Sequence, residues 1–312
     1  MKNMKKYLSL LLALAMCLSL LALSACSSSD DEDETSDAGT SESSDANTET
    51  SDSDETDPSS YGDDVAAIIE SGVLKVGVKD AVEGFGYQDT LTGERSGLEI
   101  DLANMIAEYL GVEVEFTTVT AATRTELLDS GDIDCVLATF TITDERKESW
   151  DFTTPYYTDH VSVLVENSSG ITTLQGLVDN SAVVGVSSGS TSARSLVEAL
   201  IDNGIIEGAD YSADTFDATT WTEGVSFQVY DDYPAISTAL SANEVQAFCV
   251  DKSILSIYNT DSRTYIEEEF AAQDYGIATT KDSGMSALCE DLITAWLADG
   301  TIDSLIESNG ID

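Results

Sequence analysis

The chain has 312 residues, with 59 acidic against 13 basic side chains and a formal net charge of −46. This surplus of acid excludes nucleic-acid binding, which needs clustered lysine and arginine, and electrostatic docking on anionic membranes. The length suits roughly two domains, and a 42% share of hydrophobic residues is enough to build their cores. Any anionic ligand must therefore be held by a few well-placed cations.

The N-terminal segment predicts export and tethering. Three lysines precede an uncharged run of leucine and alanine that ends in Leu23-Ser24-Ala25-Cys26. We interpret 1–25 as a signal peptide, although the run is also long enough to be a retained membrane anchor. Residues 27–64 carry 15 acidic and no basic side chains, so a disordered linker is expected over 26–64.

The Leu-Ser-Ala-Cys ending resembles the bacterial lipobox, in which the cysteine becomes the lipid-modified N-terminus. This resemblance implies that Cys26 carries a lipid such as palmitate. The mature protein is then expected to be extracytoplasmic and anchored to the bacterial cell membrane.

The remaining cysteines favour neither a disulfide framework nor a metal site. Cys135, Cys249 and Cys289 are odd in number and lack C-x-x-C spacing, so we expect buried free thiols. The single histidine, His160, lies in a strand pattern and is interpreted as structural. A His/Cys metal cluster and a histidine-activated nucleophile are therefore not predicted, and we expect no metal, no cofactor and no enzymatic activity.

From residue 65 the chain alternates short β-branched runs with helical periodicity. In chain order the pattern predicts a strand at 74–78, a helix at 99–110, strands at 112–119, 134–138 and 161–165 with a short helix at 123–129, then a helix at 173–178, a strand at 182–187, a helix at 191–203, a strand at 227–230, a helix at 233–243, strands at 247–250 and 275–279, and a helix at 285–297. The polar stretch 207–226 predicts a surface insertion. Such alternation is typical of α/β domains with mainly parallel sheets, which bind ligands beyond the carboxyl ends of their strands.

A threonine- and arginine-containing segment follows the predicted strand 134–138. Thr139 and Thr141 are spaced to point the same way, and Arg146 can form two hydrogen bonds with a carboxylate. Alternatively, Thr143 caps the next helix and Arg146 pairs with a surface acid.

Two more strand ends carry candidate binding groups. The segment 187–191 closes a strand and opens a helix, whose free N–H groups favour an anion near Ser190 and Thr191. Ordinary N-capping by either residue is the alternative. Asp251 follows the strand 247–250, where it can accept a ligand ammonium group or remain a solvated carboxylate.

The stretch 65–312 resembles the family 3 extracellular solute-binding proteins, the amino-acid receptors of ABC importers. Motifs in a single order along the chain carry this resemblance: Gly97-Leu98-Glu99-Ile100-Asp101-Leu102, the run 138–146, Trp150-Asp151-Phe152, Asp251, Tyr275-Gly276-Ile277-Ala278 and Asp299-Gly300-Thr301. Leu98 stands where an aromatic residue is commoner. The resemblance narrows to the glutamate/aspartate-binding branch through Ala121-Ala122-Thr123-Arg124, Phe85-Gly86-Tyr87 and Asp232-Tyr233-Pro234.

The resemblance implies an α/β fold of the periplasmic-binding-protein type II kind, with two lobes joined by a two-crossing hinge. The first lobe would hold 65–163 and 275–312, and the second lobe 164–274. Closure of the lobes would bury an amino-acid ligand. We expect a monomer whose partners are an ABC permease and its ATPase.

The resemblance also implies roles for individual side chains. Arg146, helped by Ser190 and Thr191, would bind the α-carboxylate of the ligand. Asp251 would bind the α-ammonium group. The other implied contacts are Thr139, Thr141, an aromatic wall at Phe85, and Tyr233 of the second lobe.

Arg124 is implied to face a side-chain carboxylate, which predicts glutamate or aspartate as the ligand. Alternatively, Arg124 is solvated and pairs with Glu126 or Asp129. The alternative functions on the same fold are a ligand-sensing module and a dehydratase-like enzyme.

Overall fold

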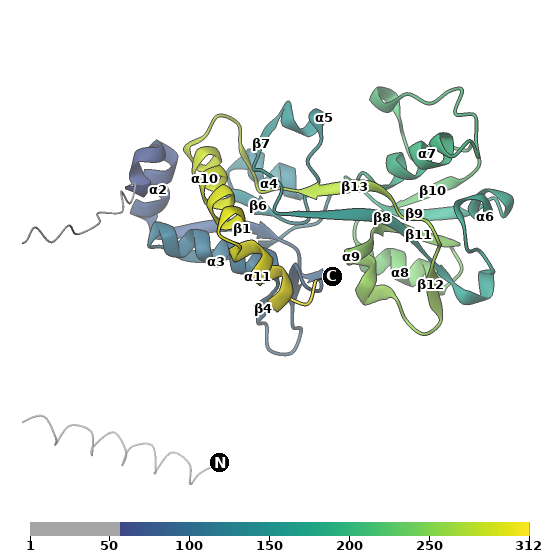
Figure 1. The fold of residues 1–312 in the computed structure, drawn as a ribbon, viewed down its shortest axis with the longest axis horizontal. Helices are drawn as coiled ribbons and strands as arrows, with labels where there is room; N and C mark the ends of the chain where they lie inside the picture. Colours follow the sequence, from purple (N-terminus) through teal and green to yellow (C-terminus); the bar gives the residue numbers. More distant parts are fainter. Residues whose placement is uncertain (1–56, 312) are drawn as a thin grey trace, which may run out of the picture. The chain divides into compact units, whose positions relative to one another are not determined.

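The computed structural model describes residues 57–311, which build two mixed β-sheets and one small sheet (Figure 1). The predicted signal peptide, Cys26 and most of the predicted linker lie outside these residues. Among the helices of the described part, none is long and apolar enough to cross a membrane.

The first lobe is built on a five-stranded sheet in the order β5-β1-β6-β14-β7. Its strands are β1 (Val73–Val78), β5 (Glu113–Thr118), β6 (Cys135–Leu137), β7 (Trp150–Phe152) and β14 (Ala278–Thr280). The helices of this lobe are α2 (Asp63–Ser71), α3 (Leu98–Leu110), α4 (Arg124–Ser130), α5 (Asp144–Lys147), α10 (Gly284–Ala298) and α11 (Thr301–Ser308). β1 pairs in parallel with β5 and β6, whereas β14 is antiparallel to β6 and β7.

The second lobe is built on a sheet in the order β10-β9-β11-β8-β12, with β13 also paired to β8. Its strands are β8 (Tyr157–Glu166), β9 (Val183–Ser187), β10 (Ser226–Tyr230), β11 (Ala247–Asp251), β12 (Arg263–Tyr265) and β13 (Phe270–Tyr275). Its helices are α6 (Leu174–Asp179), α7 (Ser192–Asp202), α8 (Tyr233–Ser241) and α9 (Lys252–Leu255). The predicted parallel alternation holds for β9, β10 and β11, but β8 is antiparallel to β11, β12 and β13.

Two antiparallel strands of the second sheet, β8 and β13, extend to the first lobe (Figure 1). They start and end beside the first lobe, where Tyr157 pairs with Tyr275. The predicted lobe boundary at 163/164 falls inside β8, and the one at 274/275 falls at the end of β13. These strands form the two crossings, while the boundaries within them stay a prediction.

The amphipathic periodicity of the sequence explains the main core. Leu102 and Ile106, four residues apart on α3, are fully buried in one cluster with Leu74 and Val76 of β1. A separate cluster fills the second lobe between β8, β9 and α7. As predicted, Cys135, Cys249 and Cys289 are free and buried within these packed regions.

Two expectations from the sequence need correction. The predicted strand 275–279 is interrupted after Tyr275, because the Gly276 N–H donates to Phe140 and the chain then moves to the first sheet. The expected linker to residue 64 ends earlier: α2 begins at Asp63, and Asp64 accepts hydrogen bonds from the first N–H groups of α10.

The stretch 207–226 has an aromatic core of its own. The rings of Tyr211, Phe216 and Trp221 lie 5.8–6.1 Å apart, and Phe216 packs against Phe227 of β10. The Tyr211 hydroxyl donates to Glu198 of α7. The predicted insertion is therefore anchored to the second lobe by packing.

Arg263 ties three elements of the second lobe together. Its guanidinium donates to Glu166 of β8 at 2.8 Å, to Ser237 and Ser241 of α8, and to the Tyr258 carbonyl. Arg263→Met should leave these acceptors unpaired and lower the free energy of unfolding by about 3–5 kcal/mol.

Urea denaturation measures this loss. The matched control is Arg194→Met, which removes a partly exposed ion pair with Glu145 and should cost less than about 1 kcal/mol. Equal losses for the two variants would contradict the structural role of Arg263.

Candidate functional site

Strand ends of both lobes bring the candidate residues to the space between the lobes. Lys79 follows β1, Thr139 and Thr141 follow β6, and Asp251 ends β11. Ser190 and Thr191 lie between β9 and α7, while Arg124 and Arg146 come from α4 and α5. This placement agrees with ligand binding beyond the carboxyl ends of strands.

Arg124 is a buried cation with backbone partners. Its side chain is 2% exposed, and Nη1 donates to the Ala138 carbonyl at 2.9 Å and to the Thr139 carbonyl at 3.2 Å. The guanidinium carbon lies 3.7 Å from the centre of the Phe140 ring. Arg124 is therefore not a solvated helix residue.

Arg146 lies on the same aromatic ring, with its guanidinium carbon 4.7 Å from the centre of Phe140. Nη1 donates to the Thr141 carbonyl at 2.6 Å, and Nη2 donates across to the second lobe, to the Gly189 carbonyl, at 2.9 Å. Desolvation and the charge of Arg124 lower the pKa of Arg146 to about 9. Thr143 does cap α5, but among the described residues the Arg146 guanidinium bonds to carbonyls and not to a surface acid.

Thr139 is held in an unusual backbone conformation. Its φ of +44° is in the left-handed region, which a β-branched residue rarely adopts. The buried carboxylate of Glu99 accepts from the Thr139 N–H at 2.5 Å and from the Tyr156 hydroxyl at 2.6 Å. Because Arg124 holds the Thr139 carbonyl, both backbone polar groups of this strained residue are fixed.

Three polar atoms in this region are buried without a hydrogen-bond partner among the described residues. They are Thr139 Oγ1, Glu99 Oε2 and Arg124 Nε. Buried polar atoms normally find a partner, and those that do not are candidates for contact with a ligand or ion.

Gln273 joins the threonines of the two lobes. Its Oε1 accepts from Thr141 at 2.9 Å and from Thr191 at 2.7 Å. Thr191 makes no capping bond to α7, and Ser190 donates to the Ser187 carbonyl, so the N-capping alternative is not found. Sequence analysis missed Gln273, which no motif marked.

Asp251 is buried beside a second carboxylate. The Tyr275 hydroxyl donates to Asp251 at 2.6 Å and to Asp159 at 3.1 Å. Desolvation, followed by the charge of Asp159, raises the pKa of Asp251 to about 7. Asp251 is therefore not a solvated carboxylate, and it is ready to ionise fully when a cation approaches.

Lys79 is a cation that sequence analysis missed. It is 4% exposed, and its Nζ lies 5.3 Å from the centre of the Tyr233 ring of the second lobe. Desolvation, helped by the charge of Arg124, lowers the pKa of Lys79. Its position directly after the predicted strand 74–78 could have marked Lys79 as a candidate site residue.

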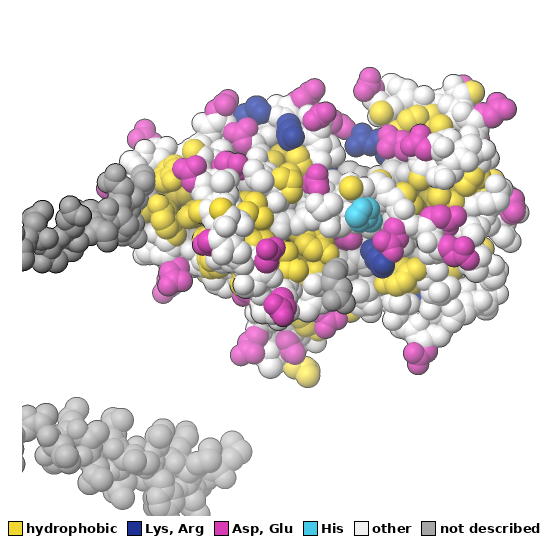
Figure 2. Space-filling view, in the orientation of Figure 1, with side chains coloured by type: hydrophobic (Ala, Val, Ile, Leu, Met, Phe, Trp, Pro, Cys, Tyr) yellow, Lys and Arg dark blue, Asp and Glu magenta, His cyan; other side chains and the backbone are white. Residues whose placement is uncertain are grey.

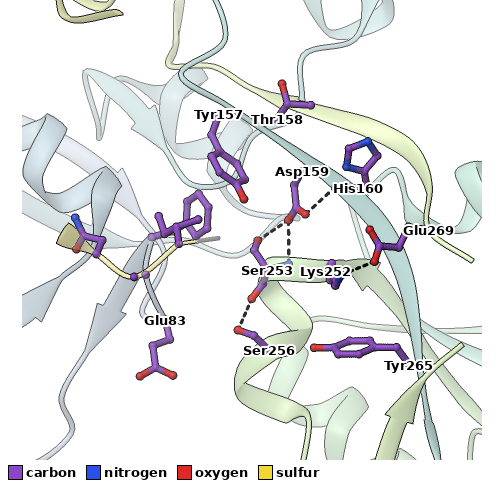
Figure 3. A pocket seen from close by; sticks show the side chains of 15 residues that line it. Glu83, Tyr157, Thr158, Asp159, His160, Lys252, Ser253, Ser256, Tyr265 and Glu269 are labelled. Atoms are coloured by element: carbon purple, nitrogen blue, oxygen red, sulfur yellow. Dashed lines mark hydrogen bonds and ion pairs between the residues drawn. The ribbon is translucent and has the colours of Figure 1, made fainter. Parts of the chain in front are cut away.

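Phe85 lies apart from the arginines. It is fully buried, with its ring edge-to-face on Tyr157 at 5.0 Å and Tyr275 at 5.7 Å. It lines a cavity of about 700 Å³ beside the hinge strands, where Glu83 lies across from Lys252 (Figure 3).

The nine predicted residues do not line one common cavity. A cavity of about 570 Å³ is lined by Arg124, Arg146, Ser190 and Thr191, together with residues of the 207–226 stretch. Tyr233 and Lys79 line a small one of about 30 Å³, while Thr139, Thr141 and Asp251 are buried. The predicted residues are thus divided between separate cavities and buried positions.

The raised pKa of Asp251 predicts a pH-dependent stability. Because the folded protein binds the proton more tightly than the unfolded chain, this contribution is present below pH 4 and lost as the pH rises through 7. The free energy of unfolding of the wild type minus that of Asp251→Asn should therefore fall by at most about 4 kcal/mol between pH 4 and pH 8. Urea denaturation at several pH values measures this difference, and a constant value would contradict the perturbed carboxyl.

Comparison with known proteins places this arrangement in a family. Residues 74–309 match the model for bacterial extracellular solute-binding proteins, family 3. The chain is 31% identical to the ABC transporter glutamine-binding protein GlnH of Bacillus subtilis, over 80% of this chain and 86% of that protein. It is 32% identical to the glutamate-binding protein GluB of Corynebacterium glutamicum, over 80% and 83%.

A solved structure of an ancestral arginine-binding protein bound to arginine superimposes with a TM-score of 0.62 and 29% identity, covering 76% of this chain and 97% of that one. Such structural neighbours are two-lobed binding proteins with the same mixed α/β architecture. This chain belongs to the bacterial extracellular solute-binding proteins of family 3.

Proposed function

We propose that this protein is the amino-acid receptor of an ABC importer and that it captures glutamate or aspartate between its two lobes. The observation that carries the acidic assignment is the number of cations between the lobes. Lys79, Arg124 and Arg146 are three cations, whereas the α-carboxylate of a ligand needs one. The nearby acids Glu99, Asp159 and Asp251 accept hydrogen bonds from neutral backbone or side-chain groups.

An acidic amino acid brings a second carboxylate, with which the remaining cations can pair. A neutral or basic side chain would leave these cations without that partner. Uncompensated charge between closed lobes is costly because water cannot solvate it. Acidic side chains outnumber basic ones on the surface shown in Figure 2. The three cations between the lobes therefore gather against the overall negative charge of the protein.

Each group of the ligand has a chemically suitable partner. Arg146 and the start of α7 at Ser190 and Thr191 bind the α-carboxylate. Asp251 binds the α-ammonium group, whose charge favours the ionised carboxylate, and Thr139 and Thr141 supply further oxygen atoms.

The cations left over are Arg124 and Lys79, and they bind the side-chain carboxylate. The orphan Arg124 Nε and the nearby Thr139 hydroxyl support this assignment, because each would gain a hydrogen-bond partner. Phe85 and Tyr233 provide apolar contacts around the ligand, although Phe85 requires a movement of the lobes to reach it.

The relatives support an amino-acid ligand without deciding which one. The names of the two curated relatives specify glutamine and glutamate, and both are binding proteins rather than enzymes. The word transporter in the first name supports a permease and an ATPase as partners. We further propose that a lipid on Cys26 tethers the protein, as a monomer, to the outer face of the cell membrane.

A thermal-shift panel of the twenty amino acids tests the proposal. Glutamate or aspartate at ~100 times its dissociation constant should add about 2.7 kcal/mol to stability. A response to glutamine or arginine alone would contradict the acidic assignment. A response to no amino acid would contradict the receptor function.

Arg124→Ala tests which cation binds the side-chain carboxylate of the ligand. The substitution leaves a ligand carboxylate unpaired, so glutamate and aspartate should lose about 2–5 kcal/mol of binding free energy. Glutamine and asparagine leave no charge unpaired, so they should lose much less binding free energy.

Isothermal titration of both proteins with all four ligands measures these losses. Lys281→Ala is the control, because Lys281 lies between β14 and α10 and forms an exposed ion pair with Asp151 of the first lobe at 3.4 Å. Equal losses for acids and amides in Arg124→Ala would mean that Arg124 does not recognise the side-chain carboxylate.

A further inference from the structure

The turn after β9 brings the backbones of the two lobes into close contact. Gly189 of the second lobe faces Ala121, which precedes α4 in the first lobe. A Cβ atom placed on Gly189 would lie 2.5 Å from the Ala121 carbonyl oxygen and 2.9 Å from its carbonyl carbon. Real Cβ atoms do not come this close to backbone atoms, so only glycine permits the observed approach.

The backbone of Gly189 also requires glycine for a second reason. Its φ of +73° lies in the left-handed region, where a side chain adds strain. The two requirements are separable, because asparagine tolerates this φ but still carries a Cβ atom.

The carbonyl of Gly189 accepts hydrogen bonds from two cations of the opposite lobe. Arg146 Nη2 lies 2.9 Å from this oxygen and Arg124 Nη2 lies 3.4 Å from it. A carbonyl oxygen carries only a partial negative charge, whereas a carboxylate forms stronger bonds with guanidinium groups. The Gly189 carbonyl thus occupies the kind of position that a ligand carboxylate would fill better.

The lobes also meet at hinge strand β13, where Gln273 accepts a hydrogen bond from Thr141 at 2.9 Å. Two further contacts between the lobes are weaker or more adaptable. Arg194 and Glu145 form an ion pair at 3.0 Å, but the Glu145 side chain is 76% exposed. Lys79 approaches the Tyr233 ring at the end of a flexible side chain. Neither contact fixes the backbone separation of the lobes as Gly189 and Ala121 do.

We infer that Gly189 sets the closest approach of the two lobes, and that its carbonyl joins them through the arginines that bind the ligand. Closure and carboxylate recognition therefore share the same cations. The first part concerns the protein without ligand, whereas the shared role of the arginines rests on the proposed function.

Gly189→Ala and Gly189→Asn test the inference. Both add a Cβ atom that meets Ala121, so both should keep the lobes apart and increase the radius of gyration measured by small-angle X-ray scattering. The asparagine variant adopts a positive φ with less strain, so it keeps the test valid if the alanine variant folds poorly. Each variant should also bind the preferred amino acid at least tenfold more weakly in isothermal titration.

Gly204→Ala is the matched control. Gly204 follows α7 with a φ of +65°, and a Cβ atom there would meet nothing within 4 Å. This variant carries the same backbone strain without an interlobe clash, so its radius of gyration and affinity should match those of the wild type.

The outcomes separate the inference from the proposed function. If both Gly189 variants keep the wild-type radius of gyration and affinity, Gly189 does not set closure and the inference is wrong, while the receptor function stands. If the wild type binds no amino acid but both variants expand relative to Gly204→Ala, the proposed function fails and the role of Gly189 in closure is supported.

Discussion

The burial of charge between two separately built lobes is the constraint on which the site depends. Lys79, Glu99, Arg124 and Asp251 are each no more than 4% exposed, and burial disfavours the charged form of each. Such groups remain tolerable only if they face partners of opposite charge or hydrogen-bond donors and acceptors. The two lobes supply these partners from different sheets, so the energetics of the site are inseparable from how the lobes meet.

The strained Thr139 shows how this constraint shapes local structure. Its N–H is held by Glu99 and its carbonyl by Arg124, while its hydroxyl stays without a partner among the described residues. Backbone strain of this kind persists only where the surroundings determine the conformation from several sides. Here two oppositely charged side chains do so, and they orient the hydroxyl as part of the same arrangement.

Periodicity and strand ends allowed much of this structure to be predicted from the sequence. The helix at 99–110 was recognisable because Leu102 and Ile106 repeat at the helical period, and both proved to be core residues. The expected strand 275–279 was wrong because its apolar run conceals a change of sheet at Gly276. A local pattern contains no information about which sheet a strand joins.

Site residues that belong to a sequence motif could be predicted, whereas isolated site residues could not. Lys79 directly follows a predicted strand and Gln273 lies on β13, but a lone polar residue at such a position is usually a surface residue, so nothing singled them out. Phe85 was placed in the ligand pocket, yet its ring packs on the hinge-strand tyrosines. These assignments depend on tertiary packing, which spacing along the chain cannot reveal.

The three buried thiols have a consequence for a protein that works outside the cytoplasm. Burial raises the pKa of Cys135, Cys249 and Cys289, so each stays in the unreactive, protonated form. Disulfide exchange and sulfenic acid formation both proceed through the thiolate. Within the described residues, these three thiols can therefore meet an oxidising environment without forming cross-links in the folded protein.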